Sequence, residues 1–261
     1  MLSSNQIKRS LRGLELEKKR DNAARESNYR EFVSLYRKNL PSVPDINTAN
    51  FWNNLLAENE NLILKSPIFL NKIKIISKIL LKEKGKVIDI GFGYGYLEDY
   101  LTSKKSKLIL YGVDISAKAV SKSKLKFNGD VKEGVVTNIP FNNKLFDVAV
   151  ALDVLEHISP NQLFRSLKEI SRVLKNNGQF IVSVPLNEGL IDMVSKGNNP
   201  NGHVRAYTPS ILNTELKLSG FSCEEVRFLY AYKNFYHFKS ILAKFLLREP
   251  NLLIGIYRKT A

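Results

Sequence analysis

The sequence predicts an α/β fold built on a mostly parallel, doubly wound sheet, and three observations support it. Short apolar runs alternate with helical segments between residues 86 and 184. A glycine-rich turn follows the first run, and near the C-terminus the pattern changes to two strands with one helix between them. Such alternation is typical of parallel strands whose two faces are both covered by helices.

The N-terminal part is expected to be helical and rich in charge. Residues 1–40 alternate acidic and basic side chains, and their few apolar residues fall at helical spacing. Pro41 and Pro44 then interrupt the chain. We therefore assign residues 1–48 to a basic helical extension and residues 49–261 to the main domain.

Helices and strands are expected in a regular order through the main domain. Apolar spacing predicts helices within residues 50–82, divided at Pro67, because proline is favoured at the first helical position. The apolar runs predict strands near residues 86–90, 108–113, 131–136, 146–152 and 179–184. Helices that connect neighbouring strands are expected at residues 95–103 and 115–126.

The C-terminal part predicts an antiparallel edge for the same sheet. Residues 224–231 and 252–258 read as two further strands, which brings the expected total to seven. Between them, apolar residues from Phe238 to Leu246 recur at i, i+3, i+4, i+7 and i+8, the pattern of one helix face. Pro250 is expected to end this helix.

Composition restricts the class of protein. With 261 residues and 44% hydrophobic residues, the chain can bury the core of one globular domain with extensions. A single cysteine, Cys223, excludes an internal disulfide framework and fits a reducing, cytoplasmic compartment. No apolar stretch approaches the ~20 residues of a membrane span.

The net charge of +15 leaves three alternatives for partners. A strongly basic protein can bind nucleic acid, contact an anionic membrane surface, or carry its charge as solvated surface. The basic residues are dispersed along the chain rather than gathered in one stripe. We therefore favour solvated surface, with nucleic-acid binding as an alternative.

The segment from Val87 to Leu97 carries the strongest functional signal, with the spacing D-x-G-x-G-x-G. Glycines at a strand-to-helix turn allow positive φ and the close approach of a ligand. A dinucleotide site would need its third glycine where Tyr96 stands, so this pattern disfavours a dinucleotide. Asp114 ends the next apolar run, 23 residues after Gly91, near the distance of ~20 residues expected for an acid that binds ribose hydroxyls.

Further blocks follow in an order that resembles the class I methyltransferases that use S-adenosylmethionine. The blocks are Asp89 to Gly95, Asn138 to Ile158 with its "FDVAV" and "VLEHI" runs, Arg172 to Pro185, and Gly202 to Pro209 followed by Gly220-Phe221. The resemblance covers roughly residues 50–259 and includes a subgroup marked by the segment "GHVRxYTP". It implies a seven-stranded, Rossmann-like methyltransferase fold and leaves the substrate open.

The resemblance also implies a cofactor site for S-adenosyl-L-methionine, with S-adenosyl-L-homocysteine as product. The residues expected to contact the cofactor are Asp89, Gly91, Phe92, Gly93, Gly95, Asp114, Ile115, Val136 and Leu152. Alternatives are a turn-capping role for Asp89 and a helix N-cap role for Asp114. Relatives often place an acid at the position of Val135, where it would accept from the adenine amino group. Valine cannot accept that hydrogen bond.

Four aromatic or polar residues and one candidate base are expected on the acceptor side. Trp52, His157, Arg205 and Tyr207 are the candidate substrate-binding residues. His203 is the candidate general base, with a loop-fixing hydrogen bond as the alternative. Residues 186–210 and 232–250 are expected to form lid-like insertions. For the second, a plain core-covering helix is the alternative, and its basic face also permits an interfacial membrane helix.

The predicted function is transfer of a methyl group from S-adenosylmethionine to a small-molecule, carbohydrate or lipid-linked acceptor, at oxygen or nitrogen. Two alternatives remain: an RNA methyltransferase with a basic N-terminal arm, and a non-catalytic cofactor-binding scaffold. No metal site is expected, because three scattered histidines and one cysteine do not form a recognisable ligand set.

Overall fold

The computed structural model describes residues 43 and 45–260. The predictions for residues 1–42, including the basic arm of the RNA-binding alternative, lie outside the described residues. Residues from Val43 onward belong to the same compact unit as the rest of the main domain. Within the described part of the chain, no helix has both the length and the apolar character needed to cross a bilayer.

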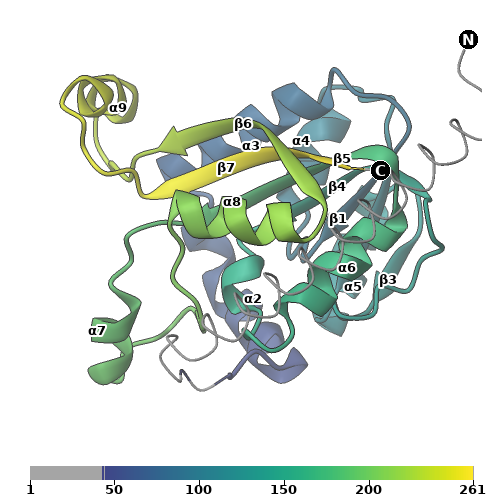
Figure 1. Ribbon diagram of the computed structural model, residues 1–261, viewed down its shortest axis with the longest axis horizontal. Coiled ribbons are helices and arrows are strands. Elements are labelled where there is room, and N and C mark those ends of the chain that lie inside the picture. The colour runs from purple at the N-terminus through teal and green to yellow at the C-terminus, as the bar shows by residue number, and fades with distance from the viewer. Residues whose placement is uncertain (1–42, 44, 261) are drawn as a thin grey trace, which may run out of the picture. The chain divides into compact units, whose positions relative to one another are not determined.

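A seven-stranded sheet forms the centre of the domain and confirms the predicted fold class (Figure 1). Its spatial order is β3-β2-β1-β4-β5-β7-β6. The strands are β1 Lys86–Ile90, β2 Ile109–Asp114, β3 Val131–Glu133, β4 Phe146–Leu152, β5 Leu174–Pro185, β6 Phe221–Leu229 and β7 Leu252–Lys259. The first five pair in parallel, and β7 pairs antiparallel with both β5 and β6.

Three strand boundaries differ from the predicted ones. Strand β3 ends at Glu133 rather than near residue 136, because Val135 pairs with Asn138 in a tight turn. Strand β5 begins at Leu174, five residues earlier than expected, and β6 begins at Phe221. The early strand residues are polar, so apolar periodicity alone could not locate these starts.

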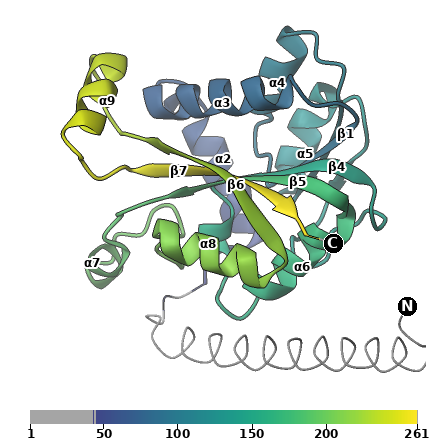
Figure 2. The same ribbon diagram turned by 45° about the horizontal axis from the view of Figure 1, so that its top comes forward.

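Helices cover both faces of the sheet (Figure 2). They are α2 Ala49–Ile63, α3 Pro67–Leu80, α4 Tyr96–Ser103, α5 Ala117–Ser123, α6 Leu163–Val173, α7 Leu190–Ser195, α8 Pro209–Leu218 and α9 Tyr236–Phe245, with the short 3₁₀ helices η1 Lys124–Lys126 and η2 Leu155–His157. Alternate strand residues separate two cores: Val87 packs with α3 and α4, whereas Ile88 packs with α6 and α8.

One edge of the sheet gathers the segments that matter for function. The parallel strands β1, β2 and β4 have their carboxyl ends there, and β5 ends there at Pro185. Because β7 is antiparallel and starts opposite Pro185, the connection from β6 to β7 leaves the same edge. Ligands of open α/β sheets bind at the carboxyl ends of strands, so this edge is where a site is expected.

Candidate functional site

A cavity of about 440 Å³ opens at the carboxyl edge of β1, β2 and β4. Its wall contains the predicted cofactor residues Gly91, Gly93, Asp114, Ile115 and Val136. The predicted substrate residues Trp52 and His157 also line it, together with Asp45, Asn47, Thr48, Leu56, Val113, Gly134, Val135, Thr137, Asp153, Val154, Ile158 and Gln162. The structure thus brings the start of the domain together with the segments that follow β1, β2, β3 and β4.

The turn after β1 depends on glycine at the cavity wall. Gly91 has φ of +72°, and a Cβ built there would lie 2.7 Å from a methyl of Val154. Gly93 has φ of +54° and donates its backbone N–H to Oδ2 of Asp114 at 2.9 Å. A larger residue at Gly91 would therefore both strain the turn and fill space at the wall. Gly95 instead begins α4 and packs on Ser123, away from the cavity.

Asp114 ties the glycine turn to the end of β2. Its Oδ1 accepts from the backbone of Ser116 at 2.8 Å, and Oδ2 accepts from Gly93. Burial raises the pKa of Asp114, although both backbone hydrogen bonds act in the opposite direction. The N-cap of α5 is Ser116, which accepts from Ala119 at 3.0 Å, so the N-cap alternative for Asp114 is wrong.

Asp89 faces a second, smaller hollow of about 120 Å³, which Phe92 and Leu152 also line. The Asp89 side chain is buried and hydrogen-bonded to Glu98 of α4. Burial, reinforced by the charge of Glu98, raises the pKa of Asp89 well above its usual value, and burial raises the pKa of Glu98 to about 7. Two buried acids therefore share this side of the turn, and Oδ1 of Asp89 meets no hydrogen-bond donor among the described residues.

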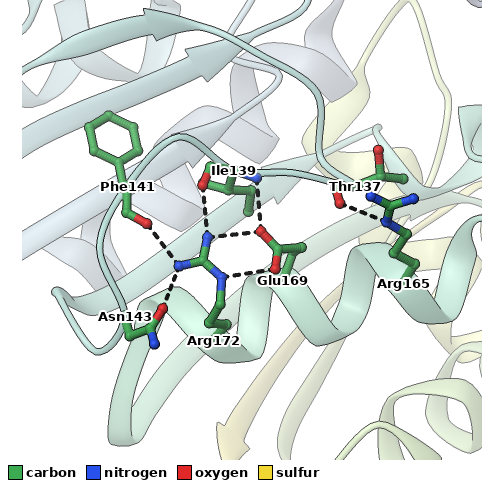
Figure 3. A network of polar contacts seen from close by, with 7 residues as sticks. All are labelled: Thr137, Ile139, Phe141, Asn143, Arg165, Glu169 and Arg172. Atoms are coloured by element: carbon green, nitrogen blue, oxygen red, sulfur yellow. Dashed lines mark hydrogen bonds and ion pairs between the residues drawn. The ribbon is translucent and has the colours of Figure 1, made fainter.

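Charged side chains of α6 hold the loop that follows β3 (Figure 3). Arg172 donates to the carbonyls of Ile139 and Phe141 at 2.7 and 2.8 Å, and Glu169 accepts from the Ile139 N–H at 3.0 Å. Arg165 donates to the carbonyl of Thr137 at 3.1 Å. The residues before these anchors, Val135 and Val136, are thereby held in the cavity wall.

Asp153 lies where the two hollows meet, directly after β4. It adopts φ of +55°, which is uncommon for a residue other than glycine and is often found at functional sites. The buried ammonium group of Lys72 pairs with Oδ2, and the Ser183 hydroxyl donates to Oδ1 at 2.6 Å. Burial alone would raise the pKa of Asp153, but the charge and hydrogen bonds of these partners outweigh it and lower the pKa.

Trp52, His157 and His203 form a row of edge-to-face ring contacts beside the cavity. The rings of Trp52 and His157 have centroids 4.7 Å apart, and those of His157 and His203 have centroids 4.8 Å apart. Nδ1 of His203 lies 2.7 Å from Oε2 of Glu188. Burial, followed by the proximity of His203, lowers the pKa of His157 to about 3, so this imidazole is neutral at physiological pH.

Arg205 and Tyr207 lie in the interior rather than in the cavity wall. The Arg205 guanidinium forms a fully buried ion pair with Glu215 of α8 and stands 4.8 Å from the ring centre of Tyr207. The substrate-binding roles of both residues stay predictions, whereas their observed contacts join the segment after β5 to α8. His203 is also buried and contacts Glu188 rather than lining the cavity.

Several residues of this edge were not identified from the sequence. Lys72 lies on the buried, mainly apolar face of α3, which is an unusual place for a lysine. Glu156 precedes His157 and is fully buried, and Asp153 follows β4 directly. The acid-rich run Asp153-Val-Leu-Glu-His was the available signal, because strand ends are where such sheets place ligand-binding groups.

Comparison with known proteins finds similarity to methyltransferases. Residues 88–182 match the model of a methyltransferase domain family. The Bacillus subtilis protein YrhH, which carries a provisional methyltransferase name, is 30% identical over 120 residues, 44% of this chain and 66% of that protein. Demethylmenaquinone methyltransferase of Thermotoga maritima is 29% identical over 111 residues, 42% of this chain and 47% of the relative. The chain matches 52–66% of the length of several curated relatives.

Solved structures agree in fold. The 1,6-didemethyltoxoflavin-N1-methyltransferase of Burkholderia thailandensis, solved with 1,6-didemethyltoxoflavin and S-adenosylhomocysteine, has a TM-score of 0.60 at 17% identity. That comparison covers 85% of this chain and 93% of the other. At this identity the match establishes the architecture, while the chemistry of each site must be argued from its own residues.

Proposed function

We propose that this chain, which belongs to the class I superfamily of S-adenosylmethionine-dependent methyltransferases, binds S-adenosylmethionine at the glycine turn and methylates an acceptor that enters beside Trp52 and His157. One observation carries the proposal. The positive-φ glycines after β1 and the buried carboxylate of Asp114 after β2 face the same cavity and are joined by a hydrogen bond. The cofactor is the one that this superfamily shares, and the identity of the acceptor is proposed from the residues of this chain.

The residues present fit such a cofactor. Gly91, at positive φ, leaves the backbone of the turn bare at the cavity wall, where a ligand can approach it closely. Oδ1 of buried Asp89 has no partner among the described residues and could accept from an ammonium group. Asp114, at the end of the neighbouring strand, is placed to accept from ribose hydroxyls, and Ile115 and Val136 offer apolar surface to a purine ring.

The bound cofactor would supply a methyl group already activated by a sulfonium. The chain's own task is then to align the acceptor with that methyl group and to exclude water. Asp153, kept ionised by Lys72 at the junction of the two hollows, would favour the cationic cofactor electrostatically. Trp52 and His157 form an aromatic wall on the acceptor side.

Calorimetric titration with S-adenosylmethionine, S-adenosylhomocysteine and NADH tests the cofactor assignment. We expect the first two to bind and NADH not to bind. Asp114→Ala should weaken both by about tenfold or more, because a hydrogen bond to a charged group contributes ~1.5–3 kcal/mol. Asp130→Ala, which removes an exposed acid at the start of β3, is the matched control and should bind normally. Absence of binding to the wild-type protein would overturn the proposal.

The acceptor is proposed to be lipid-linked, and helix α9 supports this choice. Only Tyr236 and Ala243 of the helix are buried, and Phe238 and Phe245 are 69% and 81% exposed. We name its exposed apolar residues the apolar ridge, made of Phe235, Phe238, Ile241, Leu242, Phe245, Leu246 and Leu247. The helix face was predicted correctly, but it points away from the core, so the core-covering alternative is wrong.

The apolar ridge matches an anionic membrane surface in both chemistry and position. Exposed basic side chains lie among its residues, at Lys233, Lys239, Lys244 and Arg248. A helix with apolar residues flanked by basic ones binds the lipid interface through burial and charge together. Figures 1 and 2 both show α9 beyond the ends of β6 and β7, on the sheet edge that carries the cavity. A lipid-linked acceptor held at a membrane would thus approach the open side of the site.

Sedimentation with vesicles tests this assignment. The full chain is expected to bind vesicles that contain phosphatidylglycerol and to bind pure phosphatidylcholine weakly. Phe238→Ser with Phe245→Ser should reduce affinity by about tenfold or more, since a buried phenylalanine side chain contributes ~1.5–3 kcal/mol. Leu125→Ser, at a site 98% exposed on η1, is the control and should bind like the wild type. Equal binding by wild type and double variant would favour a soluble acceptor.

A further inference from the structure

Three potential metal ligands meet beside the cavity, although the sequence separates them. Glu156 and His157 belong to η2, directly after β4, whereas His203 comes from the long connection after β5. One ligand atom from each residue lies within 4.8 Å of the other two. The sequence-based expectation of no metal site considered spacing along the chain, and the fold brings these residues together across 46 positions from His157 to His203.

Glu156 is an independent sign of a missing cationic partner. Its side chain is fully buried, and apart from the backbone of Glu156 itself, no described residue donates a hydrogen bond to its carboxylate oxygens. Burying an unpaired carboxylate costs several kcal/mol, so such a group is either protonated or neutralised by a cation. The two imidazoles within reach of Glu156 favour a cation here. The ammonium of Lys72 pairs with Asp153 and does not satisfy Glu156.

The two imidazoles are oriented as metal ligands usually are. Nδ1 of His203 contacts Oε2 of Glu188 at 2.7 Å, and Nδ1 of His157 faces the carbonyl of Gly202 at 3.4 Å. Carboxylate and carbonyl oxygens only accept, so each Nδ1 must carry the proton. Nε2 of each ring therefore keeps a lone pair. A carboxylate behind a histidine is the arrangement that fixes the tautomer of metal-binding imidazoles.

We propose that Glu156, His157 and His203 bind one divalent cation, of the class that prefers two imidazoles and one carboxylate. That ligand set suits Zn²⁺, Mn²⁺ or Fe²⁺ and leaves coordination positions open for a substrate. Because the three atoms lie within 4.8 Å of one another, each would need to move by no more than roughly an ångström to reach bonds of about 2.1 Å.

The cation site adds a role in binding the acceptor to the proposed methyl transfer, and this role rests on that proposed function. His157 lines the cavity, so an acceptor hydroxyl there can coordinate the cation while the methyl donor occupies the glycine turn. A metal-bound hydroxyl loses its proton to solvent at lower pH than a free one. Its oxygen then bonds to the methyl carbon as the carbon–sulfur bond breaks, and that bond's electron pair remains on sulfur in S-adenosylhomocysteine. His203 serves here as a ligand rather than as a general base.

The only tryptophan of the chain provides a readout that is independent of activity. The Trp52 ring lies against His157, at 4.7 Å between centroids. The full chain is freed of metal with a chelator and titrated with Co²⁺ or Mn²⁺, which quench indole emission at short range, and with Zn²⁺ by calorimetry. We expect saturable binding of one ion per chain with quenching of Trp52 emission.

Variants separate this site from adventitious binding. Glu156→Gln and His203→Asn should each weaken metal affinity at least tenfold, and the positioning variant Glu188→Gln should weaken it about 10–100-fold. His237→Asn, which removes the exposed histidine of α9, should leave affinity unchanged. Metal binding that is absent, or unaltered in Glu156→Gln and His203→Asn, would overturn the proposal.

Binding of S-adenosylhomocysteine by each variant separates the two proposals and reports folding. Variants that bind S-adenosylhomocysteine like the wild type but lose metal support the cation site. Wild-type protein that binds S-adenosylhomocysteine without metal defeats the cation site alone. Wild-type protein that binds metal at these residues without S-adenosylhomocysteine defeats the proposed methyl transfer and leaves the cation site standing.

Discussion

Two connections at the carboxyl edge of the sheet have opposite characters. Residues 186–208, after β5, turn polar and charged side chains inward, with His203 and Arg205 both buried. Residues 230–251, between β6 and β7, turn apolar side chains outward, with Phe245 and Leu247 81% and 90% exposed. Both segments were expected to be lid-like insertions, and both leave the same edge of the sheet.

The difference shows what each segment is built to contact. Burying a charged group is costly unless a partner compensates it. Within the first segment Glu188 contacts His203, and Arg205 pairs with Glu215 of α8. Exposing a large apolar patch is equally unusual for a monomer and marks an interaction surface. The inward segment thus packs behind the cavity wall, where His203 and Gly202 contact His157, whereas the outward segment exposes an apolar surface.

Breaking the buried pair of the inward segment is expected to have the largest effect on stability. Arg205→Met leaves Glu215 buried without its cation, which should lower the free energy of unfolding by ~3–5 kcal/mol. Urea denaturation measures the change. Arg205→Met combined with Glu215→Leu should restore most of it, because the charge is removed together with its partner.

An exposed pair provides the contrast. Arg227 and Glu225 on β6 also form an ion pair, with side chains 37% and 47% exposed. Arg227→Met should cost less than ~1 kcal/mol, since solvent screens such pairs. A similar cost for Arg205→Met and Arg227→Met would mean that the inward segment does not depend on its buried charge.

Replacing the buried acid Glu98 tests how burial of a carboxyl group changes the stability of the protein with pH. Its pKa is raised to about 7 by burial, above the ordinary 4.5, so folding favours its protonated form. Its contribution to stability is therefore fully present below pH 4.5 and is lost as pH rises through about 7. Glu98→Gln stays neutral, so the variant should match the wild type near pH 5 and exceed it at pH 8 by ~1–3 kcal/mol.

Thermal or urea unfolding at the two pH values measures this effect. Glu133→Gln, which changes an exposed acid at the end of β3, is the control and should show no gain at pH 8. A Glu98→Gln variant that tracks the wild type across the whole range would mean that Glu98 keeps its charge through a contact with Lys126 or solvent.

The sequence identified several residues that line the cavity, because they follow one another directly in the chain, and their contacts with a cofactor stay predictions. The Gly91 and Gly93 turn follows β1 directly, and Asp114 and Ile115 end β2, so strand periodicity alone places them on one edge. The same logic located the seven strands along the chain. Gly95 caps the start of α4 and does not line the cavity, so its cofactor contact stays a prediction.

The acceptor side could not be predicted in the same way, because it depends on contacts between distant segments. Whether His203 faces the cavity or Glu188 is set by the path of residues 186–208, which contains little regular structure. Helical periodicity likewise identified the apolar face of α9 but not its direction, because a pattern records which residues share a face and not what that face meets.

Two glycines of the inward segment give the smallest and most selective test. Gly202 and Gly197 have nearly equal φ values, +68° and +66°, so alanine at either position should cost ~1 kcal/mol for backbone strain. A Cβ at Gly202 would also lie 3.0 Å from the Phe51 ring and 3.1 Å from Oδ1 of Asn47, whereas nothing lies within 4 Å of one at Gly197.

Gly202→Ala should therefore cost about 1 kcal/mol more than Gly197→Ala in urea unfolding, since the neighbours must shift. The Gly202 carbonyl accepts from Asn47 at 2.9 Å and faces His157, so the shift would also loosen the wall beside the cavity. An equal loss of unfolding free energy in the two alanine variants would show that the neighbours of Gly202 shift without an energetic penalty. His203 would then be held mainly by Glu188 and Asn199, and packing at Gly202 would not distinguish the inward from the outward segment.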